Sequence, residues 1–192
     1  MKALFRFTAI AALILIVAIF QPAHAQFLSY GVKGGLNLAN IGGADAPESE
    51  ARTGFHVGGF LGLSVLGIVA VEGGVYYSQK GYTNLAGDTP RDFVFNYIDV
   101  PLVAKFSPLP LIHLFAGPQL SYFLDGNIKD TDNDFNKENY TRPDMAVVVG
   151  AGMNIPGGLR ISVGYDYGLT PINVDEKEIH NRVIKLSIGF KM

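Results

Sequence analysis

The sequence predicts an all-β fold, an eight-stranded antiparallel up-and-down β-barrel, on the strength of three observations. Apolar and polar residues alternate with a period of two along most of the chain, and no segment shows good helical periodicity. Long polar segments alternate with short turns between the expected strands. The chain has no Cys, so neither a disulfide framework nor a thiolate metal site accounts for its fold.

The N-terminus predicts a cleaved signal peptide at residues 1–25. Lys2 and Arg6 form a basic start, residues 9–20 (AIAALILIVAIF) are all apolar, and Ala23-His24-Ala25 is an A-x-A cleavage site. The apolar run is shorter than the roughly 20 residues of a membrane-spanning helix, although an uncleaved anchor helix remains the alternative. Cleavage leaves residues 26–192 as a single barrel domain.

The first four expected strands each carry apolar residues at alternate positions. They are residues 29–40 (Tyr30, Val32, Leu36, Leu38), 54–64 (Phe55, Val57, Leu61, Leu63), 68–80 (Val69, Val71, Val75, Tyr77) and 93–106 (Ile98, Val100, Leu102, Phe106). The last four follow the same rule. They are residues 113–124 (Leu114, Leu120, Tyr122, Leu124), 144–155 (Met145, Val147, Val149, Met153), 159–169 (Ile161, Val163, Tyr165, Tyr167) and 182–192 (Ile184, Leu186, Ile188, Phe190).

Charged residues divide between the long connections and one face of the strands. About 13 of the 17 acidic residues lie in the long segments 42–53, 81–92, 125–143 and 170–181. Charges inside the strands all lie on the face opposite the apolar row, where the other residues are mostly small or polar. The predicted polar network on this face is Lys33, Glu72, Lys80, Asp99, Lys105, Asp144, Arg160, Asp166 and Lys185.

Two kinds of barrel share this alternation. A soluble, lipocalin-like periplasmic carrier would enclose its apolar face around an apolar ligand, whereas a transmembrane barrel turns that face toward lipid. The polar face is rich in Gly and poor in Lys and Glu, which suits a narrow lumen better than a solvated surface. Tyr residues on the apolar face suit interfacial girdles, and strands of roughly 10–12 residues cross a bilayer when tilted. The transmembrane barrel is therefore the preferred prediction.

An eight-stranded barrel is just wide enough to be filled by its own side chains. We therefore expect the inward charges to pair across the lumen, because unpaired buried charge is costly. A narrow ion or small-solute channel is the alternative use of the same charges. Pro101 removes one donor from the strand ladder, which predicts a local bulge.

Six segments, taken in order, resemble the Bacteroidetes outer-membrane β-barrel family, whose members are described as porin-family or PorT-like proteins. The segments are GVKGGLNLANI, GVYYSQKG, YIDVPLVAKF, LFAGPQLSYFL, GAGMNI and YDYGLTPIN. The resemblance covers essentially the whole of residues 26–192. It implies an eight-stranded barrel in the outer membrane of a Gram-negative bacterium, with no defined activity for most members. A few relatives act in type IX secretion and gliding.

The expected role is therefore structural or interactive, within the cell envelope, without a cofactor. The expected partners are outer-membrane lipid and lipopolysaccharide, the barrel-assembly machinery and an unidentified envelope protein. A net charge of −2 gives no indication of nucleic-acid binding.

Two weaker signals concern chemistry. Asp130, Asp132 and Asp134 alternate in DTDNDFNKE, which makes them a candidate loop cation site, but the residues that an EF-hand requires as Gly and Glu are Phe135 and Thr141. The remaining candidate is His180 with Asp175 or Glu178 as a catalytic pair. Neither signal is enough to predict a metalloprotein or an enzyme.

Overall fold

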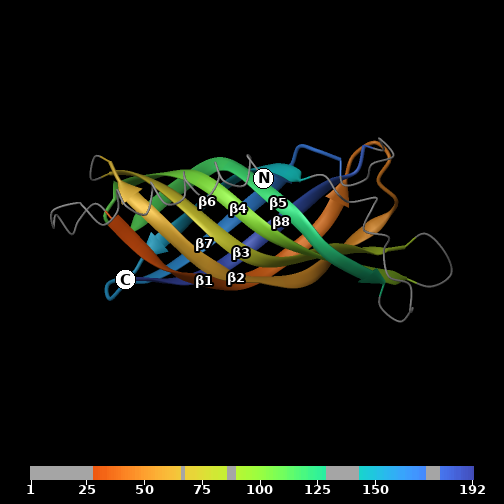
Figure 1. Cartoon of the computed structure of the whole chain (residues 1–192), viewed down its shortest axis with the longest axis horizontal. Helices are drawn as coiled ribbons and strands as arrows, with labels where there is room; N and C mark the ends of the chain where they lie inside the picture. Colours follow the sequence, from red (N-terminus) through yellow and green to blue (C-terminus); the bar gives the residue numbers. More distant parts are fainter. Residues whose placement is uncertain (1–27, 66–67, 86–89, 129–142, 172–177) are drawn as a thin grey trace, which may run out of the picture.

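The computed structural model describes residues 28–65, 68–85, 90–128, 143–171 and 178–192, which form a closed antiparallel barrel (Figure 1). The strands are β1 (Leu28–Gly42), β2 (Ser49–Ser64), β3 (Val69–Asn84), β4 (Arg91–Leu109), β5 (Ile112–Ile128), β6 (Asp144–Asn154), β7 (Leu159–Gly168) and β8 (His180–Lys191). Each strand pairs with its neighbours in sequence, and β8 closes the barrel against β1. The predicted all-β, eight-stranded up-and-down barrel is confirmed. The predicted signal peptide lies outside the described residues.

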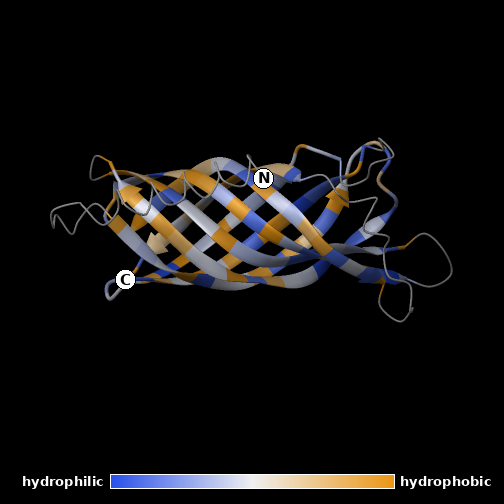
Figure 2. Cartoon of the chain, viewed as in Figure 1, coloured by the Kyte–Doolittle hydropathy of each residue, from blue (hydrophilic) through white to orange (hydrophobic). Residues whose placement is uncertain are grey.

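The barrel is apolar outside and polar inside. Val32, Leu61 and Ile188 are 54%, 62% and 59% exposed on the outer surface, whereas Asp99 is fully buried in the lumen. Hydrophobic and hydrophilic residues alternate along the ribbons in Figure 2 because successive side chains of a strand point to opposite faces. This arrangement excludes the lipocalin-like alternative, which requires an apolar interior. Within the described ranges, no helix has the length and apolar character needed to span a membrane.

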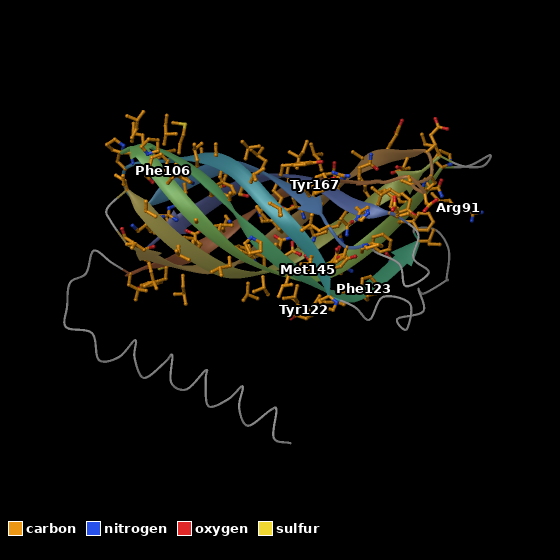
Figure 3. All side chains as sticks on the ribbon, turned by 90° about the horizontal axis from the view of Figure 1, so that it is seen from above. Arg91, Phe106, Tyr122, Phe123, Met145 and Tyr167 are labelled. Carbon is orange, nitrogen blue, oxygen red and sulfur yellow. The ribbon has the colours of Figure 1, made fainter. Side chains whose placement is uncertain are left out.

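The two ends of the barrel differ in the connections that join the strands and in how far the strands extend. The strand ends joined by the short connections after β2, β4 and β6 form one end, called here the turn end. The strand ends joined by the long connections form the other, the loop end. β6 begins at Asp144 opposite Ser121, so residues 122–128 of β5 continue past β6 at the loop end. Arg91 and Phe106, near the two ends of β4, lie at opposite ends of the barrel in Figure 3. In outer-membrane barrels the short turns are periplasmic and the long loops are extracellular.

The first five strands are longer than predicted, at 15 to 19 residues instead of the 11 to 14 of the predicted ranges. The predicted lengths covered only the apolar rows, which have to cross the bilayer. Past those rows, cross-strand pairs extend the sheet at the loop end. Tyr82 on β3 stacks on Phe93 on β4, with 4.9 Å between ring centroids, and Phe93 pairs in register with Ile128 on β5.

The bulge predicted at Pro101 is wrong. On the β3 side, the pairs Gly73–Leu102 and Tyr76–Asp99 share one register, so no residue is inserted between them. The sheet tolerates the missing N–H donor without slipping. The register between β4 and β5 shifts elsewhere, near residues 96–97 and 106–109.

Inward glycines make room for rings from neighbouring strands. A Cβ atom on Gly31 would lie 2.7 Å from the Phe60 ring, and one on Gly152 would lie 2.6 Å from the His113 ring. A ring over a glycine on the next strand is a known way of filling a tightly curved sheet. The Gly-rich polar face therefore follows from the narrow lumen that these rings fill.

Candidate functional site

The lumen contains a buried ionic network on its loop-end side, called here the Asp99 cluster. Its members are Lys80, Asp99, Gln119, Ser121, Asp166 and Lys185. Lys80 Nζ lies 2.8 Å from Asp99 Oδ1, and Lys185 Nζ lies 2.9 Å from Asp99 Oδ2. Lys185 also lies 2.6 Å from Asp166 Oδ2. Two ammonium groups and two carboxylates thus neutralise one another across the barrel.

Neutral side chains complete the Asp99 cluster. Ser121 donates to Asp99 Oδ1 over 2.6 Å and accepts from Lys80 over 3.0 Å. Gln119 donates to Asp166 Oδ2 over 3.0 Å. These bonds bring donors from β3, β5 and β8 onto carboxylates of β4 and β7. Such bonds offset the cost of burying the charges. The other carboxylate oxygen of Asp166, Oδ1, is buried without a hydrogen-bond partner among the described residues.

A second chain of neutral groups lies beside this cluster. His56 contacts Asn37 Oδ1 through Nδ1 at 2.8 Å and Ser187 Oγ through Nε2 at 3.0 Å. Asn37 in turn donates to Ser78 Oγ over 3.1 Å. All four residues are buried, and they link β8, β2, β1 and β3. Together with the Asp99 cluster, they close the loop-end half of the lumen.

The turn-end half contains a smaller ionic group, called here the Glu72 cluster: Glu72, Lys105 and Arg160. Lys105 Nζ and Arg160 Nη1 both contact Glu72 Oε2, at 2.6 Å and 2.9 Å. The Arg160 guanidinium also lies over the Phe60 ring, 5.1 Å from its centroid. One carboxylate thus serves two cations, which leaves this cluster with a net positive charge.

Two of the predicted network residues do not pair as expected. Lys33 has no acidic partner within ion-pair distance among the described residues, and its ammonium lies 4.7 Å from the centroid of the Tyr76 ring. Asp144 accepts hydrogen bonds from neutral groups, Thr170 Oγ1 at 2.8 Å and Asn181 Nδ2 at 2.7 Å. Asp144 is in register with Ser121 of the Asp99 cluster, but within the described ranges it forms no ion pair with Lys80 or Lys185.

Two cavities lie in and at the mouth of the lumen, as bounded by the described residues. An inner cavity of about 60 Å³ lies within the lumen, and a mouth cavity of about 780 Å³ opens at the turn end. Lys105, His113 and Arg160 line both cavities and form the boundary between them. The inner cavity has room for only a few waters. The lumen is therefore open to solvent at the turn end and filled by the Asp99 cluster toward the loop end.

The structure places all nine predicted network residues inside the barrel and assembles seven of them into the two ionic clusters. The predicted network left out the neutral residues that bond to one another or to these charges, although the alternation already placed them on the same inward face. Those residues are Asn37, His56, Ser78, Gln119, Ser121 and Ser187.

The candidate cation site at Asp130, Asp132 and Asp134 lies outside the described residues, as does Asp175. His180 and Glu178 share no hydrogen bond; the Glu178 backbone N–H donates instead to Asp45, over 2.9 Å. In the described ranges, no three His, Cys, Asp or Glu side chains are grouped closely enough to hold a metal ion.

Comparison with known proteins places this geometry in context. Residues 9–191 match the family described as outer membrane protein beta-barrel domain. No curated protein matches the chain.

Solved structures with the same fold include two outer-membrane barrels. Neisserial surface protein A (NspA) has a TM-score of 0.62 and 15% identity, over 85% of this chain and 97% of that one. Ail, the attachment invasion locus protein of Yersinia pestis, has a TM-score of 0.55 and 13% identity, over 85% of this chain and 98% of that one. The family match, together with the apolar outer surface, locates the protein in the outer membrane. The chain belongs to the outer membrane protein β-barrel domain family.

Proposed function

We propose that this protein is a sealed barrel with a structural or interaction role, and that it meets its partner at the loop end. The observation that carries this proposal is the complete burial of Asp99 between Lys80 and Lys185. An ion crossing the lumen would have to separate these charges in a region of low dielectric, where their attraction is strongest. A lumen closed in this way leaves the surface of the barrel as the place for function.

The loop end supports an interaction role through its shape. Strands β2 to β5 extend the sheet past β6. Within the part of the chain that the structure describes, residues 122–128 of β5 pair only with β4. An unpaired strand edge offers backbone donors and acceptors to another polypeptide. Aromatic contacts stiffen this extension, including Phe95 with Phe123 at 6.2 Å between ring centroids.

The charge of the long segments favours a basic partner. They hold 13 acidic residues but only six Lys and Arg in the sequence. Ail has been crystallised in complex with the heparin analogue sucrose octasulfate, a polyanion. The loops of the present chain would repel such a ligand, so we propose a cationic protein surface, or lipopolysaccharide phosphates bridged by divalent ions.

Further parts of the proposal rest on the family resemblance and on the outer surface. We propose membership of the PorT-like, porin-family group of Bacteroidetes, delivery by the barrel-assembly machinery, and contact with outer-membrane lipid. We propose no enzymatic activity and no nucleic-acid partner.

Conductance is the direct test. Purified protein is first checked for a boiling-dependent mobility shift on a mild SDS gel, which reports the folded barrel. The folded protein is then reconstituted in planar bilayers. We expect no discrete conductance steps, because the Asp99 cluster fills the lumen. Stepwise currents from heat-modifiable protein would contradict the sealed barrel and establish the narrow channel instead. The mouth cavity favours that alternative, since it opens the turn end of the lumen to water.

The proposed charge of the partner is tested separately. Vesicles containing the oriented barrel are passed over a polylysine surface at increasing NaCl concentration. We expect retention that falls with salt and is weakened by the double variant Glu48→Gln, Glu50→Gln at the loop end. Lys191→Gln, at the turn end, is the matched control and should leave retention unchanged. Equal retention by both variants would contradict a role for the loop-end acids.

A further inference from the structure

The turn-end half of the lumen carries more positive charge than its acidic groups neutralise. Lys33, Lys105 and Arg160 lie in this half, and Lys191 lies at its rim, whereas Glu72 is the one strand acid here in the described residues. The loop-end half differs, because two lysines face Asp99 and Asp166. Uncompensated charge in a partly buried site is costly unless a counter-ion accompanies it.

The excess charge faces the mouth cavity. Three cations, Lys105, Arg160 and Lys191, line this cavity, and no described Asp or Glu does. The side chains of Lys105 and Arg160 are 12% and 16% exposed, so their outer faces remain accessible through the mouth. Each of the two donates one bond to Glu72. Within the described ranges their other N–H groups make no further hydrogen bond, so these groups can bind a ligand.

His113 lies at the boundary between the two cavities. It is 3% exposed and lines both of them, and its Nδ1 atom is buried with no hydrogen-bond partner among the described residues. The mouth cavity is therefore bounded on its inner side by a polar ring, beside the cations Lys105 and Arg160.

We propose that the turn-end mouth of the barrel binds a small oxyanion of the phosphate class. Arg160 and Lys105 form the floor of this site, His113 forms its inner wall and Lys191 its rim. The planar guanidinium presents parallel donors that match the oxygen atoms of a phosphate. Hydroxyl and amide groups around the mouth add uncharged donors, namely Ser29, Ser64, Ser107 and Asn154.

The dimensions of the cavities confine the ligand to the mouth. The inner cavity of about 60 Å³ holds only a few waters, whereas the mouth cavity of about 780 Å³ admits a hydrated oxyanion or the phosphate of a larger molecule. The Asp99 cluster blocks any onward passage to the loop end. The site is therefore a binding site at a closed end, independent of the interaction role proposed for the loops.

Calorimetric titration with inorganic phosphate tests this proposal. The complete barrel is refolded in an uncharged, phosphate-free detergent and checked for its heat-dependent mobility shift, and the titration is run at constant ionic strength. We expect saturable binding. Lys191→Gln should weaken it by about two- to fivefold, the range of an exposed ion pair. Arg160→Gln should weaken it by about tenfold or more, because a charged hydrogen bond is lost.

Two further variants make the test specific. Glu72→Gln removes the competing carboxylate and should tighten binding, the opposite sign to Lys191→Gln. Arg91→Gln, an exposed arginine at the loop end, is the matched control and should bind as the wild type does. Absence of saturable binding to folded wild-type protein would overturn the proposal. So would an equal loss in Arg91→Gln and Lys191→Gln, since binding would then depend only on overall charge.

The source of the phosphate is distinguished by repeating the titration in lipid nanodiscs. If a lipid headgroup occupies the site, phosphate should bind more weakly in phosphatidylglycerol nanodiscs than in detergent. Lys191→Gln should then reduce this difference between nanodiscs and detergent. Unchanged binding would identify a free phosphate compound. Both outcomes support an oxyanion site and differ only in its occupant.

Discussion

The two ionic clusters of the lumen differ in how they meet water. In the Asp99 cluster, the Lys80 and Asp99 side chains are 2% and 0% exposed, and charges of both signs balance. In the Glu72 cluster, one carboxylate serves Lys105 and Arg160, whose side chains remain open to the mouth cavity. Full closure requires neutrality, whereas an open end tolerates excess charge because solvent and ions can reach it. The same inward polar face therefore forms a plug at one end and a charged mouth at the other.

The largest effect is expected from Asp99→Ala. This change leaves Lys80 and Lys185 buried without their shared carboxylate, and we expect the free energy of unfolding to fall by about 3–5 kcal/mol. The measurement is the urea dependence of the folded, fast-migrating gel band after refolding into vesicles. Glu50→Ala, an exposed acid at the loop end, is the control and should change stability by less than about 0.5 kcal/mol. A similar loss in both variants would remove the distinction between plug and surface.

Glu72→Ala should have a smaller effect, about 1–3 kcal/mol by the same urea titration. Removing this acid also leaves two cations, but Lys105 and Arg160 can be hydrated through the mouth cavity. A loss as large as that of Asp99→Ala would show that the turn end is as dry as the loop end, and the contrast between the two clusters would fail.

Salt should change the stability losses of the two variants by different amounts. At about 1 M NaCl, where the Debye length is about 3 Å, we expect the loss caused by Glu72→Ala to shrink by roughly half. Screening ions reach the mouth but not the lumen around Asp99, so the loss caused by Asp99→Ala should stay constant. Equal salt dependence of the two losses, measured on the two variants and the wild type in parallel, would contradict this difference in access.

The smallest effect is expected from Lys33→Met. Lys33 has no acidic partner among the described residues, and its ammonium rests on the Tyr76 ring. An apolar side chain of similar length keeps the packing and removes a charge from a crowded positive region. We expect a change between zero and about 1 kcal/mol, in the stabilising direction. Clear destabilisation in the urea titration would show that Lys33 contributes to the Glu72 cluster.

Much of the fold was predictable because period-2 alternation fixes the face of each side chain. Tyr30, Leu61 and Ile188 were placed outside and Asp99 inside without any knowledge of strand pairing, and the structure agrees. The strand extensions at the loop end were not predictable from bilayer thickness. They depend on cross-strand contacts such as the Tyr82–Phe93 stack, which exist only when β3 and β4 are paired in one register.

The membership of the ionic clusters was predictable only as a set. The position of a charged residue in the alternating pattern shows that its side chain points inward. The pattern does not show which partner that side chain contacts. Glu72 and Arg160 are 88 residues apart and Asp99 and Lys185 are 86 apart, so their contacts depend on the stagger of a closed barrel. The expected pairing of Lys33 and Asp144 differed from the structure for the same reason. Lys33 lies in the same half of the lumen as Glu72, but the Glu72 carboxylate contacts Lys105 and Arg160 instead. Asp144 accepts hydrogen bonds from Thr170 and Asn181.

The sequence by itself determined a barrel of eight strands, its apolar outside and its polar inside, because these properties follow from local alternation and from the length of the connections. Only the tertiary structure decided where the lumen is closed and where it is open. Closure requires residues from β3, β4, β5, β7 and β8 to meet at one height, and that meeting is set by register and barrel stagger.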